Sequence, residues 1–356
     1  MNETPNPAAS PQTSGPPSQE LRLLIQKVSG GTALTQGEIR GALEQMTAGA
    51  ATPAQMGAFL MALRVRGETV EEITGAAEML RARMHRVAVP ADAIDIVGTG
   101  GDSHGTYNIS TCAAIVAAGA GIRIAKHGNR RVSSKSGASD VLAELGVRLD
   151  APFEVIARCV NEAGLGFLWA PQHHPAMRHW AAIRGELGIR TIFNLLGPIC
   201  NPGGVRSQVV GVFSRDWVEP IAQVLRNLGA ERVWVVHGHD GLDELTTTGA
   251  TDVAELKAGA ITTFEVTPAD AGLAPAKLAD LRGGDEKENA AAIRAVLGGK
   301  RTPLRDIALL NAAAALMVAN RAANLVDGVA LAAHAIESGA AAGVLEKLAA
   351  ISSGRA

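Results

Sequence analysis

The residues best suited to chemistry gather between positions 98 and 139, where glycines, hydroxyls and basic side chains alternate. A glycine turn, Gly98-Thr99-Gly100-Gly101-Asp102, precedes Asn108-Ile109-Ser110-Thr111 and then Lys126-His127-Gly128-Asn129-Arg130. Glycines let backbone amides approach an anion, and a helix beginning near Ser110 would add the positive end of its dipole. Lys126 and Arg130 supply cationic charge. The stretch therefore predicts a site for a phosphate-rich ligand.

Two familiar phosphate motifs do not fit this turn. Ser103 stands where a dinucleotide fingerprint has its third glycine, and no acidic residue lies about 20 residues further on. No Gly-Lys-Ser/Thr follows, so the turn is not a P-loop. Two interpretations of the turn remain. It is either a site where Gly98, Gly101 and Asp102 approach a ligand closely, or only a tight connection between a strand and a helix.

The hydroxyl and basic segments also have two interpretations. Asn108, Ser110 and Thr111 could simply cap a helix, although hydroxyls at a helix start also bind phosphate or a phosphate-bound metal. The run 126–130 directly follows an apolar strand, and Lys, Arg and Asn are poorly suited to burial, so a binding role is favoured. Ser133 and Ser134 extend this polar loop.

Three distant groups could complete such a site. Asp243-Glu244 follows an expected strand, and Mg²⁺ is commonly held by one or two carboxylates together with substrate phosphates. Arg184 could clamp a substrate carboxylate through two parallel hydrogen bonds, or make a surface ion pair with Glu186. His174 could face the same substrate or be a structural histidine.

The chain divides into three parts. Residues 1–19 hold five prolines among small polar residues and are expected to be a disordered tail. Residues 20–92 are expected to form a helical domain, joined by part of 172–190, because capping boxes open three helices at Thr35, Thr52 and Thr69.

Residues 93–356 change to short apolar strands alternating with helices, which predicts an α/β domain with a mainly parallel sheet. Strands are expected within 95–97, 122–125, 209–213, 233–236, 252–256 and 261–266. Helices are expected at 111–120, 138–146, 152–163, 215–228, 286–298 and 303–321. Ligands in such folds bind at the carboxyl ends of the strands.

Composition narrows the function. With 33 Lys and Arg against 35 Asp and Glu in 356 residues, no basic surface indicates nucleic acid. No apolar run is long enough to span a membrane, and the N-terminus lacks a signal-peptide pattern. Three cysteines without metal spacing suit a reducing, cytoplasmic setting.

In this order the motifs resemble the anthranilate phosphoribosyltransferase family of tryptophan biosynthesis. The matching strings are DIVGTGGD (95–102), NIST (108–111), KHGNR (126–130), HPAM (174–177), RGELGIRTIFNLLGP (184–198) and GLDE (241–244). The resemblance implies a small helical domain and a larger α/β domain of nucleoside phosphorylase type, dimerising through the helical domain. It also implies transfer of phosphoribosyl from phosphoribosyl pyrophosphate to anthranilate.

The resemblance assigns roles residue by residue. Phosphoribosyl pyrophosphate would meet Gly98, Gly101, Asp102, Thr106, Asn108, Ile109, Ser110, Thr111, Lys126, His127, Gly128, Asn129, Arg130, Ser133 and Ser134. Anthranilate would meet Gly98, His127, Asn129, His174 and Arg184. Mg²⁺ would be bound by Ser110, Asp243 and Glu244, and Lys126 with these two carboxylates would be catalytic.

Two rivals stay open at this point. A pyrimidine nucleoside phosphorylase would need neither the magnesium carboxylates nor Arg184. A non-catalytic nucleic-acid-binding relative would need a basic groove. Two positions depart from the family pattern, since Ala138 replaces a serine and Ala182 a proline.

Overall fold

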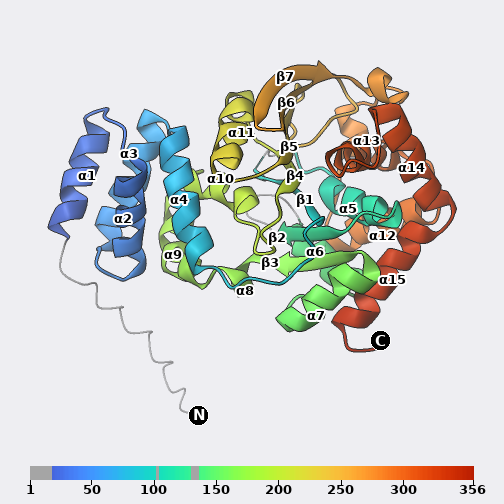
Figure 1. Cartoon of the computed structure of the whole chain (residues 1–356), viewed down its shortest axis with the longest axis horizontal. Coiled ribbons are helices and arrows are strands. Elements are labelled where there is room, and N and C mark those ends of the chain that lie inside the picture. The colour runs from blue at the N-terminus through green and yellow to red at the C-terminus, as the bar shows by residue number, and fades with distance from the viewer. Residues whose placement is uncertain (1–17, 102–103, 130–135) are drawn as a thin grey trace, which may run out of the picture.

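The computed structural model describes residues 18–101, 104–129 and 136–356, and all structural statements below refer to these ranges. Four helices come first: α1 (Gln19–Ser29), α2 (Gln36–Thr47), α3 (Pro53–Arg66) and α4 (Val70–Arg83). In Figure 1 they stand side by side at one end of the molecule, in blue. Of the expected tail at 1–19, residues 1–17 lie outside the described residues, whereas Ser18 caps α1 by accepting the Leu21 amide and Gln19 begins that helix.

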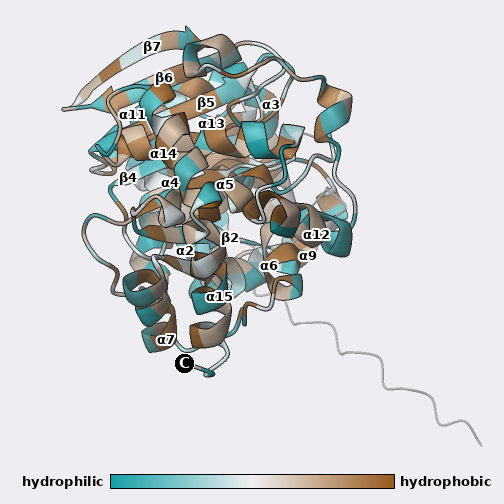
Figure 2. Cartoon of the chain, turned by 90° about the vertical axis from the view of Figure 1, so that its right-hand side faces the viewer, coloured by the Kyte–Doolittle hydropathy of each residue, from teal (hydrophilic) through white to brown (hydrophobic). Residues whose placement is uncertain are grey.

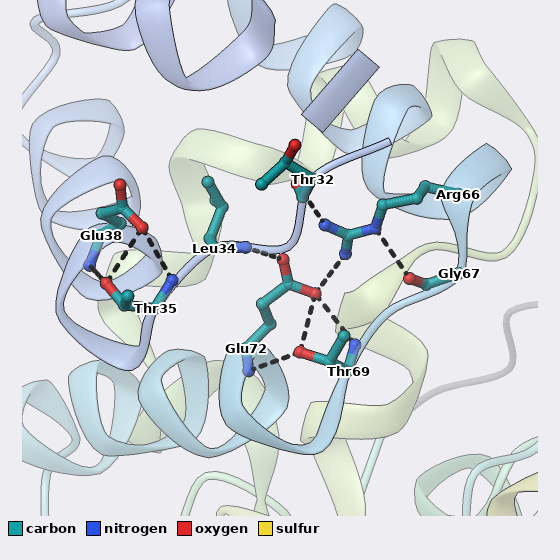
Figure 3. Close-up of polar contacts among 8 residues, drawn as sticks. All are labelled: Thr32, Leu34, Thr35, Glu38, Arg66, Gly67, Thr69 and Glu72. Atoms are coloured by element: carbon teal, nitrogen blue, oxygen red, sulfur yellow. Dashed lines mark hydrogen bonds and ion pairs between the residues drawn. The ribbon is translucent and has the colours of Figure 1, made fainter. Parts of the chain in front are cut away.

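The three predicted capping boxes are confirmed at the starts of α2, α3 and α4. The box that opens α4 is the most connected (Figure 3). Glu72 is fully buried, accepts the Leu34 amide at 2.8 Å and the Thr69 amide at 2.9 Å, and pairs with Arg66. A buried carboxylate is costly unless it is paired and hydrogen-bonded, and this network satisfies the charge of Glu72 with groups from α3, from the start of α4 and from the segment before α2.

A seven-stranded sheet forms the centre of the second part, in the order β3-β2-β1-β4-β5-β6-β7. Its strands are β1 (Ile94–Gly98), β2 (Ile124–Gly128), β3 (Leu165–Trp169), β4 (Ser207–Gly211), β5 (Arg232–Gly238), β6 (Thr251–Lys257) and β7 (Ala260–Val266). The first five in this order are parallel, whereas β6 and β7 run antiparallel to their neighbours. The expected mainly parallel sheet is therefore confirmed, with an antiparallel ribbon at one edge.

Helices cover both faces of this sheet (Figure 1). The helices that follow β1 in the chain are α5 (Ile109–Gly119), α6 (Ala138–Glu144), α7 (Phe153–Arg158), α8 (Ala170–His173), α9 (Arg178–Leu187), α10 (Ile192–Ile199), α11 (Val218–Asn227), α12 (Glu286–Leu297), α13 (Pro303–Val318), α14 (Leu325–Glu337) and α15 (Ala340–Ser352). Helix α5 is buried almost throughout and is packed between α13 and α15. Strand β7 lies at one edge of the sheet, where most of its residues are exposed, and it contains both hydrophilic and hydrophobic residues (Figure 2).

Several elements were not predicted from the sequence, among them β3, α8, α10, α14 and α15. Strand β3 lies in a segment whose pattern was ambiguous, and α14 and α15 lie in the alanine-rich C-terminal stretch. Helices α9 and α10 leave the sheet and pack on α3 and α4, so that Trp180 and Phe193 join one apolar cluster with Phe59. The substrate arginine that the resemblance implies, Arg184, thereby lies between the two parts.

Among the described helices, none alone combines the length and apolar composition of a membrane span. Helices α14 and α15 meet that criterion only as a pair bent by 64°.

Candidate functional site

Three neighbouring strands end in glycine at the carboxyl end of the parallel sheet. β1 ends at Gly98, β4 at Gly211 and β5 at Gly238, and the loop after β5 folds back over the first two. A Cβ on Gly211 would lie 1.6 Å from the carbonyl oxygen of Asp243, and one on Gly98 would lie 2.3 Å from its Oδ2. Only glycine fits such close approaches, so these strand ends determine where Asp243 sits.

Both expected metal carboxylates are anchored by backbone amides of the glycine turn and of α5. The Gly100 amide donates to Asp243 Oδ2 at 2.6 Å, and the Ser110 amide donates to Glu244 Oε1 at 3.2 Å. Glu244 thus lies at the positive end of α5, where the helix dipole favours negative charge. Two carboxylates beside the hydroxyl of Ser110 form a set of hard oxygen donors of the kind Mg²⁺ uses.

Lys126, in β2, extends its side chain to Ser110 at the start of α5. It is 2 % exposed, and its Nζ donates to the Ile96 carbonyl at 2.6 Å and to Ser110 Oγ at 3.2 Å. Burial lowers the pKa of Lys126, while the charges of Asp95, Glu244 and Asp243 act in the opposite direction and favour the ammonium form. The amino group of Lys126 therefore donates to the same Ser110 whose amide binds Glu244.

Asp95 is a buried partner of Lys126 that the sequence analysis did not single out. It is fully buried, accepts the His127 amide at 3.2 Å and accepts Asn201 Nδ2 at 2.7 Å. Burial raises the pKa of Asp95 to about 6, although Lys126 opposes this shift. Asp95 and Asn201 lie 106 residues apart in the chain, so no local pattern could have paired them.

Asn108 does not cap α5 with its side chain, although it occupies the N-cap position. Its Oδ1 instead accepts Ser136 Oγ at 3.2 Å and Asn289 Nδ2 at 2.9 Å, and Asn289 also donates to Ser136 at 2.7 Å. This triangle joins the start of α5, the segment before α6 and helix α12. The capping interpretation of Asn108 is therefore wrong, and Asn289 is a second residue that the sequence analysis missed.

A cavity of about 530 Å³ opens beside this cluster. Its apolar wall includes Val97, Met177, Phe193, Leu196 and Pro198, and its polar lining includes Gly98, His127, Asn129, His174 and Arg184. All five residues that the resemblance assigns to anthranilate therefore line one cavity. Gly98, the last residue of β1, lines this cavity and is also packed against Asp243, so the cavity and the carboxylate are adjacent.

Arg184 is the cationic group on the α9 side of this cavity. Its guanidinium carbon lies 5.4 Å from the centre of the Phe193 ring, a cation–π geometry. Within the described residues Arg184 makes no ion pair, so the surface pair with Glu186 does not form there. Burial lowers the pKa of Arg184, but an arginine stays protonated at neutral pH.

Two neutral imidazoles lie next to each other in the lining. The rings of His127 and His174 are 5.1 Å apart, and His127 Nδ1 lies 3.0 Å from the Gly197 carbonyl oxygen. That contact requires a proton on Nδ1, which leaves Nε2 as an acceptor. Burial lowers the pKa of His127 well below its usual value and that of His174 to about 4. The Nε2 atoms of both rings are buried without a hydrogen-bond partner in the described structure.

The remaining site residues fall into four groups. Gly128, Asn129 and Ser110 lie at the sheet edge with the cluster, and Ile109 and Thr111 lie in the first turn of α5 with buried side chains. Thr106 pairs in an isolated bridge with Arg282. Asp102, Arg130, Ser133 and Ser134 lie outside the described residues.

Comparison with known proteins gives a consistent result. A model of the glycosyl transferase family α/β domain matches residues 90–342, and one of the same family's helical bundle domain matches 22–84. A protein from Rhodopseudomonas palustris named anthranilate phosphoribosyltransferase is 60 % identical over 333 residues, covering 94 % of this chain and 98 % of that protein.

Solved structures agree with this match. The anthranilate phosphoribosyltransferase of Thermus thermophilus is 43 % identical with a TM-score of 0.87, covering 93 % of this chain and 99 % of that one. The Saccharomyces cerevisiae enzyme in complex with phosphoribosyl pyrophosphate and Mg is 31 % identical with a TM-score of 0.87, covering 95 % and 99 %. The same yeast enzyme has been solved with 4-fluoroanthranilate, at 29 % identity and a TM-score of 0.84, covering 94 % and 99 %.

Proposed function

The chain belongs to the anthranilate phosphoribosyltransferase family, and on that premise we propose how its own residues carry out the reaction. It is a glycosyltransferase of tryptophan biosynthesis that joins phosphoribosyl pyrophosphate to the amine of anthranilate and releases pyrophosphate. The observation that carries this proposal is that Gly98 lines the same cavity as Arg184 and lies directly against Asp243. An aromatic acid in that cavity would lie beside a polyphosphate at the sheet edge.

Phosphoribosyl pyrophosphate would bind at the glycine turn and the start of α5. Its phosphates would meet backbone amides there, the hydroxyl of Ser110 and the ammonium group of Lys126. Asn108, Asn129, Gly128, Thr106 and Thr111 would complete the described part of this pocket. Asp102, Arg130, Ser133 and Ser134 carry the same assignment as predictions.

Mg²⁺ would be held by Asp243, Glu244 and Ser110 together with the phosphates of the substrate. The support is the donor set itself, two carboxylates and a hydroxyl oriented by the Gly100 and Ser110 amides. When bound, the ion neutralises part of the charge that builds up on the departing pyrophosphate.

Anthranilate would lie in the cavity with its carboxylate on Arg184 and its ring against the apolar wall. The guanidinium group offers two parallel donors to a carboxylate. The acceptor Nε2 of His127 could receive an amine proton of anthranilate, because Nδ1 is committed to Gly197. A neutral His127 also avoids placing a third cation between Arg184 and Lys126.

The chemical step needs alignment more than a strong base. The aromatic amine is already neutral at pH 7, whereas positive charge develops on the ribose as pyrophosphate leaves. Lys126 would stabilise the departing anion, and holding the amine against the ribose carbon replaces a bimolecular encounter with an oriented one. Nitrogen bonds to carbon as the carbon–oxygen bond breaks, and no covalent enzyme intermediate is required.

Two broader proposals concern the setting of the enzyme. We infer a homodimer through the helical domain, supported by Val65 on α3 at 81 % exposure and Leu23 on α1 at 58 %. A drop in sedimentation coefficient for Val65→Asp would support it, and an unchanged dimer would contradict it. We also infer a cytoplasmic location, since all three cysteines are free and buried.

The test of function is the loss of anthranilate fluorescence on mixing purified protein, phosphoribosyl pyrophosphate and Mg²⁺. The proposal predicts a loss that requires all three components and releases one pyrophosphate per anthranilate consumed. No loss with folded protein, while a reference enzyme works in the same buffer, would contradict it. Uridine or thymidine with orthophosphate forms the parallel arm that tests a phosphorylase.

A further inference from the structure

A second group of metal-ligating side chains lies away from the residues assigned to the two substrates. His239 follows β5, Asp252 lies at the start of β6, and Glu265 lies near the end of β7. Asp252 pairs directly with both His237 and Glu265 in the sheet register. Directly opposed residues present their side chains on one face of a sheet, and His239 follows His237 by two residues. The three side chains therefore converge on one face of the antiparallel ribbon.

Their spacing matches that of donors around one ion. His239 Nε2 lies 3.1 Å from Asp252 Oδ2 and 3.8 Å from Glu265 Oε1, and the donor atoms all lie within 4.8 Å of one another. Ligands of Zn²⁺ sit about 2.0–2.2 Å from the metal, so two tetrahedral ligands lie about 3.3 Å apart. Small side-chain movements suffice to bring all three donors onto a common ion, and the His239 side chain is 41 % exposed and able to adjust.

The carboxylate of Asp252 supplies an independent reason to expect a ligand. The residue is only 7 % exposed, and its buried Oδ2 faces His239 Nε2 at 3.1 Å, with no hydrogen bond to any described residue outside the group. Its other oxygen, Oδ1, is held at 3.0 Å by Arg215. A ligating carboxylate whose second oxygen is fixed by a neighbouring donor is a common arrangement at metal sites. Oδ2 is thus fixed in place and directed at His239.

We propose that His239, Asp252 and Glu265 form a binding site for a transition-metal dication such as Zn²⁺, distinct from the Mg²⁺ site of catalysis. One imidazole with two carboxylates suits Zn²⁺ and its neighbours in the first transition row, whereas Mg²⁺ prefers oxygen ligands alone. The fourth position would hold water. The ion would fasten the end of β5 to the β6–β7 ribbon and so stabilise the fold.

Hydrogen bonds of Asp240 hold the loop between this site and the carboxylates Asp243 and Glu244. Asp240 accepts the hydroxyls of Thr246 and Thr248 and the Leu242 amide, and the Gly238 amide donates to the Leu242 carbonyl. Asp243 is therefore positioned by contacts that do not involve His239. Removing the proposed ion should leave catalysis close to normal.

The experiment titrates Zn²⁺ into chelator-treated full-length protein, carrying no histidine tag, in the presence of excess Mg²⁺ and a chromogenic competitor. The proposal predicts one Zn²⁺ per chain, a higher melting temperature with Zn²⁺, and Co²⁺ absorption in the visible range. His239→Ala should weaken binding by at least about tenfold and remove the thermal shift, and Glu265→Gln should weaken it too. His334→Ala is the matched control, since that histidine is also exposed.

Two results would overturn the proposal. One is wild-type protein that binds no stoichiometric Zn²⁺, and the other is a His239→Ala variant that binds it as tightly as wild type. Neither bears on the transferase reaction, which is measured separately by anthranilate fluorescence on the same preparations. Failure of this site and failure of the proposed function are therefore distinguishable.

Discussion

At the scale of single residues, Arg184 is the side chain whose removal should affect anthranilate and leave phosphoribosyl pyrophosphate binding largely unchanged. It lines the cavity, lies 5.4 Å from the Phe193 ring centre and carries a permanent charge. A hydrogen bond to a charged group contributes about 1.5–3 kcal/mol, so Arg184→Ala should raise the KM for anthranilate by about 10- to 100-fold. Steady-state kinetics with each substrate varied in turn measure this. Arg190→Ala is the control, because that arginine stacks on Phe213 instead.

An equal rise in the KM of phosphoribosyl pyrophosphate for Arg184→Ala would show that the arginine does not act on anthranilate alone. The assigned division of roles would then be wrong.

Asp243 should show the opposite dependence. Asp243→Asn removes one charge from the donor set while preserving the side chain's size, and the Gly100 amide can still donate to its oxygen. We expect a higher Mg²⁺ requirement and poorer use of phosphoribosyl pyrophosphate, by about tenfold or more, with little change in the KM for anthranilate. Mg²⁺ titrations of the initial rate measure it, with the surface variant Asp216→Asn as control. An unchanged Mg²⁺ dependence would remove Asp243 from the metal site.

His174 makes stability depend on pH in a definite direction. Burial lowers its pKa in the folded protein to about 4, below the value of about 6.5 in the unfolded chain. The unfolded state therefore binds the proton first as pH falls, so the stabilisation is complete above about pH 6.5 and is lost progressively toward pH 4. That loss amounts to at most about 3 kcal/mol.

The check compares melting temperatures of wild type and His174→Asn from pH 7 to pH 4. The difference between them should shift in favour of the variant as the pH falls, because the variant lacks this titration. His334→Asn, at an exposed position, should follow wild type throughout. Parallel curves for His174→Asn and wild type would contradict the buried neutral imidazole.

The limits of prediction at this scale are physical. The motif residues were found because they are adjacent in sequence and poorly suited to burial. Asp95, Asn201 and Asn289 were missed because their hydrogen bonds join segments more than 100 residues apart. Each looks locally like an ordinary strand, turn or helix residue. Their role becomes visible only once the sheet brings the segments together.

At the scale of elements, the ends of strands determine the geometry of the site. The glycines that end β1 and β4 leave room for the loop carrying Asp243. Gly211→Ala would place a Cβ 1.6 Å from the Asp243 carbonyl oxygen, and this atom is backbone that cannot move aside cheaply. We expect lower stability and an increased Mg²⁺ requirement together, measured by thermal unfolding and Mg²⁺ titration.

Gly249→Ala is the matched control for Gly211→Ala. A Cβ at Gly249 meets nothing within 4 Å, and its backbone does not have a positive φ. It should leave both readouts near wild type. A Gly211→Ala variant with normal stability and normal Mg²⁺ dependence would show that the loop is not held in this way.

Helices and strands were predictable where the hydrophobic pattern was bounded by residues that begin or end such elements. Helices α2, α3 and α4 followed from their capping boxes, and β1 and β2 from apolar runs before glycine or lysine. Helices α14 and α15 were missed because alanine-rich sequence with scattered polar residues gives a weak apolar period. The antiparallel pairing of β6 and β7 was missed because the direction of a strand depends on the connection that precedes it.

At the scale of the whole molecule, Arg81 fastens the helical domain to the sheet domain. It lies in α4 and donates to the Ile199 carbonyl at 2.9 and 2.6 Å and to the Leu228 carbonyl at 3.3 Å. Arg81→Ala would leave buried carbonyls without their charged donor, at a cost of about 1–3 kcal/mol. We expect a lower melting temperature and a higher KM for anthranilate, because the Arg184 wall of the cavity packs on the helical domain.

Arg83→Ala, on an exposed position of the same helix, controls for the loss of charge. A variant Arg81→Ala with wild-type stability would show that these three hydrogen bonds do not hold the domains together.

We propose that anthranilate and phosphoribosyl pyrophosphate meet at Gly98, with Arg184 on one side and Asp243 on the other. The most direct test is a crystal structure with phosphoribosyl pyrophosphate, Mg²⁺ and benzoate, which lacks the reacting amine. We expect the benzoate ring in the cavity, its carboxylate about 2.8 Å from the Arg184 guanidinium, and the metal on Asp243 and Glu244. Benzoate bound elsewhere, or a metal bound without either carboxylate, would contradict it.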